Sequence, residues 1–90
     1  MVTRYHYRIT GRVQGVGFRY QSRVYANRLG ITGWVRNMWD GSVELELQGE
    51  EHMIDRMIMS LNSDRFINIE SIERIKINVN ESERDFLVKR

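Results

Sequence analysis

The chain has 90 residues, of which 41% are hydrophobic and 29% charged, and it contains no cysteine. So short a chain suits one compact domain, residues 1–90, because its apolar residues cannot be divided between two cores. The lack of cysteine excludes thiolate catalysis and cysteine-based metal sites. No apolar run approaches the roughly 20 residues that span a bilayer, and the N-terminus lacks the apolar segment of a secretory signal, so we expect a soluble cytoplasmic protein.

The charges are distributed unevenly along the chain. Residues 1–39 carry seven arginines and no acidic residue, whereas residues 40–90 carry seven basic and twelve acidic residues. A one-sided distribution of this kind attracts ligands of the opposite sign. We therefore expect an anionic ligand near the N-terminal half.

The first predicted element is a strand from Tyr5 to about Arg12, because apolar and polar residues alternate along it. After the glycine-rich turn 14–17 the period changes, and an apolar stripe from Phe18 to Leu29 predicts a helix. Gly30 is the expected C-cap of that helix.

Two further strands are predicted, over 32–38 and 43–48, and the pair Asp40-Gly41 between them is a hairpin signal. They should therefore pair antiparallel. A second helix is predicted from Glu50 to Leu61, because its apolar residues form one stripe and its first turn is acidic.

The fourth strand lies between Ile67 and Val79, where the apolar phase slips twice, so we expect a bulge or two short strands. Phe86–Arg90 suggests a short final strand. The fold class that follows is α+β: a ferredoxin-like βαββαβ sandwich, with a mainly antiparallel sheet, two helices on one face and a short C-terminal edge strand.

The turn before the first helix is a candidate anion site. A glycine-rich turn that leaves a strand and opens a helix exposes backbone N–H groups that no intrahelical carbonyl accepts. Arg19 and Arg23 lie in the first turns of the helix, where the macrodipole disfavours cations unless an anion is bound. Two alternatives stay open: the glycines only permit a sharp turn, and both arginines extend into water.

Asn37 is a second candidate, because an uncharged side chain that both donates and accepts can orient a water molecule. The alternative is a residue beside the turn that hydrogen-bonds its own backbone.

Two segments resemble the signatures of the acylphosphatase family. The first, from Ile9 to Arg19, resembles the family's first signature at every characteristic position. The second is Gly33–Asn37, followed at the family's spacing by Gly41, Val43 and Gly49. The resemblance covers nearly the whole chain. Departures occur at Gly49-Glu50 and Asn62–Phe66, where the family usually has prolines.

The resemblance implies an enzyme, an acylphosphatase that hydrolyses carboxyl-phosphate anhydrides to carboxylate and phosphate. It implies that Arg19 binds the phosphate and that Asn37 positions the attacking water. The loop residues implied to hold the phosphate, chiefly through their backbone, are Gln14, Gly15, Val16, Gly17 and Phe18. We expect no metal and no cofactor, because no cluster of His, Asp or Glu accompanies the loop. The expected partners are a small acyl phosphate and inorganic phosphate, with no nucleic acid, no membrane and a monomeric state.

Two other functions compete with this interpretation. A basic ferredoxin-like domain can bind nucleic acid, but the aromatic strand motif of such domains is missing and the second half of the chain is acidic. A non-catalytic acylphosphatase-like domain is the other alternative. His6 and His52 are expected to be solvated surface residues, and Trp34 and Trp39 to be packing residues.

Overall fold

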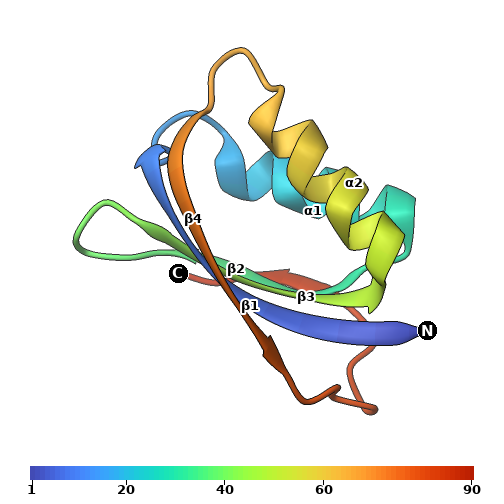
Figure 1. The fold of residues 1–90 in the computed structure, drawn as a ribbon. Helices are drawn as coiled ribbons and strands as arrows, with labels where there is room; N and C mark the ends of the chain where they lie inside the picture. Colours follow the sequence, from blue (N-terminus) through green and yellow to red (C-terminus); the bar gives the residue numbers. More distant parts are fainter.

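The computed structural model describes all residues from 1 to 90. The elements in chain order are β1 (Val2–Arg12), α1 (Phe18–Leu29), β2 (Thr32–Asn37), β3 (Val43–Glu50), α2 (Glu51–Asn62), β4 (Asn68–Ile77) and β5 (Phe86–Val88). The strands form one sheet in the order β4-β1-β3-β2-β5, and both helices cover the same face (Figure 1). The predicted ferredoxin-like sandwich with a C-terminal edge strand is confirmed. Neither helix has the length and apolar character needed to cross a membrane.

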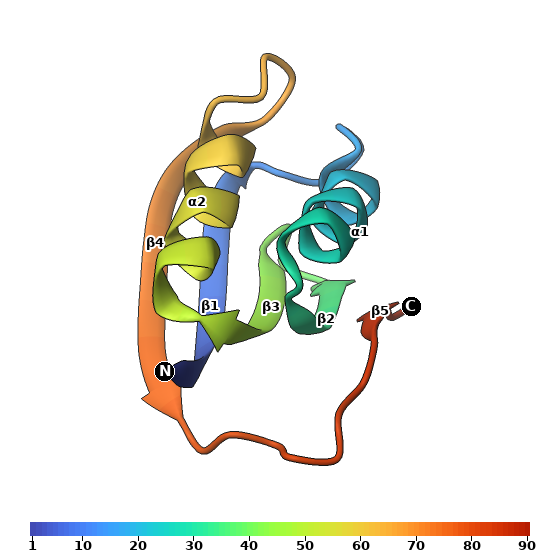
Figure 2. The same cartoon turned by 90° about the vertical axis from the view of Figure 1, so that its right-hand side faces the viewer.

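The sheet is antiparallel except at one edge. β1 pairs antiparallel with β3 and β4, and β2 pairs antiparallel with β3, as the hairpin signal predicts. β5 runs parallel to β2 at the edge opposite β4. The connecting segment 78–85 therefore passes from one edge of the sheet to the other, below the ends of the strands in Figure 2.

The core lies between the sheet and the two helices. Strand residues such as Ile9 and Leu45 alternate into it, and Ile54 and Met57 enter from the predicted stripe of α2; each is fully buried. Burial of a side chain of this size contributes about 1.5–3 kcal/mol. Phe18, the first residue of α1, is 2% exposed and belongs to the same core. The core thus fixes the N-terminus of α1 and the turn that leads into it.

β4 is one strand with a bulge, and this accounts for the two slips in its apolar phase. Ser71 pairs with Thr10 and Ile69 with Gly11, so Glu70 is the extra residue. The second slip needs no irregularity, since Ile75 is paired with His6 and lies on the face without helices, where it is 66% exposed. The expected bulge is confirmed, and the alternative of two short strands is wrong.

The helix-free face of the sheet carries a network of ion pairs. Arg4 is 5% exposed and donates hydrogen bonds to Glu46 at 2.9 Å and Glu83 at 2.7 Å. Gln48 donates to the carbonyl oxygen of Asn80 at 2.9 Å. These bonds hold segment 78–85 against the sheet. His6 is half-buried, with Nδ1 2.8 Å from Glu46, so the expectation of a solvated histidine is wrong there.

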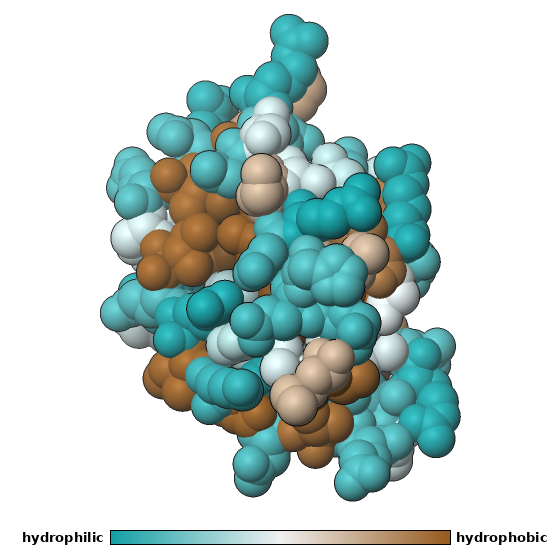
Figure 3. Space-filling view, turned by 45° about the vertical axis from the view of Figure 1, so that its right-hand side comes forward, coloured by the Kyte–Doolittle hydropathy of each residue, from teal (hydrophilic) through white to brown (hydrophobic).

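The two tryptophans differ in environment. Trp34 is half-buried, and the Nζ of Lys89 lies 4.3 Å from its ring centroid. Trp39 is 95% exposed at the start of the tight turn between β2 and β3, so the packing role expected for it is wrong. On the face shown in Figure 3, polar side chains divide the hydrophobic surface into separate patches. That face offers no continuous apolar area to a partner.

Candidate active site

The turn between β1 and α1 is shaped by two glycines. Gly15 has a φ of 73° and Gly17, the N-cap of α1, a φ of 83°, values in the left-handed region where a Cβ is disfavoured. The backbone N–H groups of residues 15–18 make no turn or cap hydrogen bond. Helix geometry also leaves the first N–H groups of α1 without an intrahelical acceptor. The turn therefore presents several donors to an anion.

The side chain of Gln14 attaches this turn to the hairpin between β2 and β3. Its Nε2 donates to the carbonyl oxygens of Met38, at 2.7 Å, and Ser42, at 2.9 Å. Asn37, the last residue of β2, directly precedes Met38. The Gln14 side chain thus faces the hairpin, and by holding it brings Asn37 beside the turn.

A cavity of about 180 Å³ lies at this junction. The predicted site residues among its lining are Gly15, Gly17, Phe18, Arg19 and Asn37; Val13 and Tyr20 complete it. Gln14 and Val16 do not line it, and Val16 contributes instead to a cavity on another side of the turn. The structure therefore brings both proposed catalytic residues to one place.

Asn37 has an unpaired polar atom at this cavity. Its Oδ1 is buried and has no hydrogen-bond partner. An unsatisfied buried acceptor costs about 1–3 kcal/mol, and in a native protein it calls for an explanation. The predicted alternative, a side chain that bonds its own backbone, is not what the structure contains. Asn37 itself lines the cavity, and a turn of its amide would present this oxygen to a group there.

Arg19 lacks a carboxylate partner. Its only polar contact is a long hydrogen bond, 3.4 Å, from Nη1 to the carbonyl oxygen of Lys89. α1 has no acidic residue in its first turn, so the positive end of the helix dipole adds to the uncompensated charge. A bound phosphate would compensate both, and the planar guanidinium can donate to two of its oxygens.

The hairpin itself is stabilised by contacts of Asp40, part of the predicted hairpin signal, with Ser42 and Arg8, for which the sequence predicted no role. The Asp40 carboxylate accepts from the backbone N–H of Ser42 at 3.0 Å and from its Oγ at 2.6 Å, and Arg8 donates to it at 3.0 Å. The hydrogen bonds from Ser42, followed by that from Arg8, lower the pKa of Asp40 to about 2. The sequence Asp40-Gly41-Ser42 is a local signal for this arrangement, because an Asp side chain often accepts a hydrogen bond from the backbone two residues later.

Fold and site together define a class: a small ferredoxin-like α+β domain with a glycine-rich turn, able to hold an anion, at the N-terminus of its first helix. The site contains no group of three or more His, Cys, Asp or Glu residues able to hold a metal ion.

Comparison with known proteins identifies the family. The acylphosphatase family model matches residues 5–88. An acylphosphatase from Clostridium acetobutylicum is 38% identical over 89 residues, 98% of each chain. The structure of an acylphosphatase from Bacillus subtilis gives a TM-score of 0.89 at 30% identity, covering all of both chains. An acylphosphatase structure from Coxiella burnetii gives 0.88 at 34% identity, over 98% of this chain and 93% of the other. The chain belongs to the acylphosphatase family, and nothing in these comparisons supports the nucleic-acid-binding alternative.

Proposed function

We propose that the protein hydrolyses acyl phosphates, with the turn 14–18 and Arg19 holding the phosphate and Asn37 positioning the attacking water. The observation that carries the proposal is that Arg19, which lacks a counterion, and Asn37, with its unpaired Oδ1, line the same small cavity. Arg19 supplies positive charge for the phosphate, and Asn37 supplies an acceptor for a hydrogen bond from the attacking water.

The chemistry requires little beyond positioning and charge stabilisation. Water attacks phosphorus, the bond between phosphorus and the acyl oxygen breaks, and the products are a carboxylate and inorganic phosphate, which takes up the water proton. A carboxylate is a good leaving group and needs no strong general acid. The backbone N–H groups and Arg19 stabilise charge on the phosphoryl oxygens as the reaction proceeds.

Asn37 acts on the nucleophile. By accepting a hydrogen bond from the water at Oδ1, the amide directs a lone pair of the water oxygen toward phosphorus and fixes the attacking geometry. Gln14 supports this arrangement indirectly, because its hydrogen bonds to the hairpin set the position of Asn37 relative to the turn.

The remaining features of the proposal are an acylphosphatase domain spanning residues 1–90, a monomer, and catalysis without metal or cofactor. A cytoplasmic location is part of it and agrees with the absence of cysteine. The partners proposed are an acyl phosphate substrate and inorganic phosphate. Sedimentation equilibrium tests the monomer, and a dimer at micromolar concentration would contradict it.

The test is hydrolysis of acetyl phosphate by the purified protein and by two variants. Asn37→Ala should lower turnover by about two orders of magnitude or more, the scale of losing a residue that positions a reactant, and spare phosphate affinity. Arg19→Ala should lower both turnover and phosphate affinity, measured by calorimetry. Asn27→Ala and Arg28→Ala, exposed positions on α1, are the matched controls. A folded wild-type protein that binds phosphate without turnover would favour the non-catalytic alternative.

A further inference from the structure

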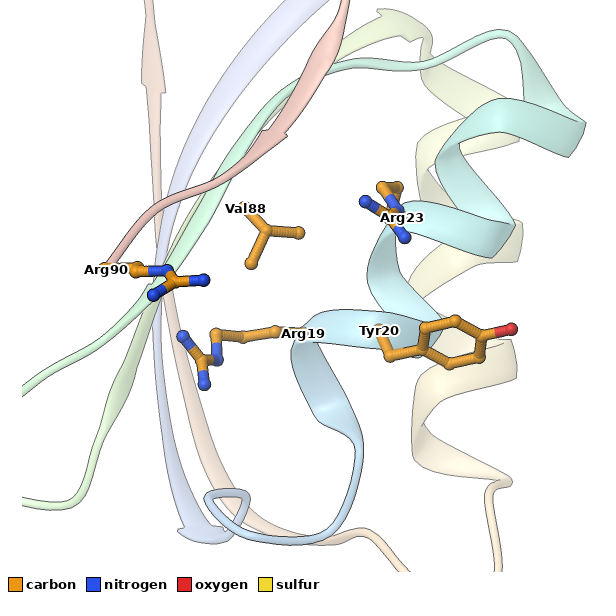
Figure 4. A pocket seen from close by; sticks show the side chains of 5 residues that line it. All are labelled: Arg19, Tyr20, Arg23, Val88 and Arg90. Atoms are coloured by element: carbon orange, nitrogen blue, oxygen red, sulfur yellow. The ribbon is translucent and has the colours of Figure 1, made fainter.

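A second, larger cavity adjoins the phosphate site. It has a volume of about 590 Å³ and is lined by Arg19, Tyr20, Arg23, Val88 and Arg90 (Figure 4). Arg19 and Tyr20 also line the phosphate cavity, so the two cavities are adjacent. In Figure 4, Arg19 and Arg90 extend toward each other on one side of Val88, and Arg23 projects from α1 on the other.

The charge of this second cavity is unbalanced. Its lining includes three arginines and no acidic residue. The side chains of Arg23 and Arg90 form no hydrogen bond and no ion pair, in contrast to Arg4, Arg8, Arg36 and Arg74, each of which has a carboxylate within 4.0 Å. Arg19 and Arg23 are also one helical turn apart, a spacing at which like charges repel. An anion in the cavity would relieve this repulsion.

We infer that this cavity holds the acyl part of the substrate and selects acyl groups that carry a second negative charge. The inference rests on the proposed function only for the identity of the first anion, the phosphate. Arg19 and Arg23 are four residues apart, which is a rise of about 6 Å along α1. A chain of three or four carbons spans this distance. Arg23 and Arg90 are then specificity-determining residues, and Val88 contacts the carbons between the two anions.

A cavity on another side of the turn is the obvious competitor, since it contains Arg12 and Arg65. It is lined by Gly15 and Val16 but by neither Arg19 nor Asn37. It shares only Gly15 with the phosphate cavity, whereas the cavity with Arg23 and Arg90 shares Arg19 and Tyr20 with it. The cavity that contains Arg19, the side chain proposed to hold the phosphate, is therefore the better candidate for the acyl group.

Stable phosphonates test the second site by calorimetry. Propylphosphonate offers one anion, 3-phosphonopropanoate adds a carboxylate at the other end, and propane-1,3-diphosphonate adds a second phosphonate. Both compounds with two anionic groups should bind about fivefold to thirtyfold more tightly than propylphosphonate. This is the range expected from one or two partly exposed charge-assisted contacts. The two together show whether the site distinguishes a carboxylate from a phosphoryl group. The preference should shrink as salt is added.

Variants assign the preference to residues. Arg23→Gln and Arg90→Gln should each reduce the affinity ratio, and the double variant should bring it to about one. Arg28→Gln, on the same helix but outside the cavity, is the control and should leave the ratio unchanged. Equal affinities for all three phosphonates in the wild-type protein would overturn the inference. Loss of the preference in Arg65→Gln instead would also overturn it and place the acyl group in the competing cavity.

Measurements of hydrolysis distinguish a failure of this inference from a failure of the proposed function. Crotonyl phosphate and fumaryl monophosphate have the same trans four-carbon chain and differ in the terminal carboxylate. The ratio of their kcat/KM values should favour fumaryl monophosphate and fall in Arg23→Gln. Hydrolysis of both with equal kcat/KM would remove the inference and leave the proposed function intact. If 3-phosphonopropanoate bound more tightly in an Arg23-dependent way but neither substrate were hydrolysed, the second anion site would stand and the proposed function would be wrong.

Discussion

Replacing Gln14 by alanine removes the attachment between the phosphate-binding turn and the hairpin. Two hydrogen bonds are lost, each with a net value of about 0.5–1.5 kcal/mol. Both acceptors keep another donor, since the Met38 oxygen accepts from Gly41 and the Ser42 oxygen from Met38. No buried carbonyl is left unpaired, so the free energy of unfolding should fall by about 1–3 kcal/mol. For a domain of this size that corresponds to a decrease in Tm of about 4–24 °C.

The same change should affect catalysis selectively. Without Gln14 the hairpin can shift relative to the turn, and Asn37 shifts with it. Turnover of acetyl phosphate should therefore fall by about tenfold, whereas phosphate affinity should stay within about twofold of wild type. Urea unfolding followed by tryptophan fluorescence, steady-state kinetics and calorimetry with phosphate measure the three quantities. Gln21→Ala, on α1, is the matched control.

The reasoning would be refuted by the opposite pattern. If Gln14→Ala weakened phosphate binding and left the unfolding free energy unchanged, the Gln14 side chain would be a ligand of the phosphate and not a support for the hairpin.

Three further predictions concern the site and its surroundings. Inorganic phosphate should inhibit competitively, raising the apparent KM for acetyl phosphate; an effect on the maximal rate alone would exclude a shared site. Activity should persist in excess EDTA, and loss that magnesium or zinc restores would contradict metal-independent catalysis. The Asp40 pKa lies below its ordinary value of 3.8, at about 2, so the stability contributed by this carboxylate is complete above pH 4 and is lost as the pH falls toward 2. Asp40→Asn should flatten the acid limb of a urea-unfolding series, and an unchanged pH dependence would show that Asp40 contributes nothing there.

Elements with local signals could be predicted from the sequence. Gly30 ends α1 with a φ of 68°, and the Asp40-Gly41 pair marks the hairpin, because capping and turn geometry depend on neighbouring residues. Periodicity likewise placed the faces of β1 and α2 correctly. The ends of the strands were less accurate, since β1 begins at Val2 and β3 extends to Glu50.

Features that depend on distant residues could not be predicted. Arg4 and Glu83 are 79 positions apart, and Gln48 and Asn80 are 32 apart, so no window of sequence indicates that segment 78–85 lies against the sheet. The hydrogen bonds from Gln14 to Met38 and Ser42 likewise join residues that are far apart in the sequence. Ile75 shows a related difficulty, because an apolar residue on an exposed strand can lie on either face of the sheet without a change in local pattern.

The buried position of Arg4 has a consequence for how the chain folds as it is synthesised. Arg4 belongs to the first strand, whereas one of its carboxylate partners, Glu83, is synthesised 79 residues later, after both helices and four of the five strands. Until then β1 can pair with β3 and β4, but Arg4 lacks one of the acids that balance its charge. A nascent chain that ends before residue 83 should therefore keep Arg4 in water and leave that end of the sheet open. Docking of segment 78–85, not formation of the helices, is then the step that closes this end of the sheet.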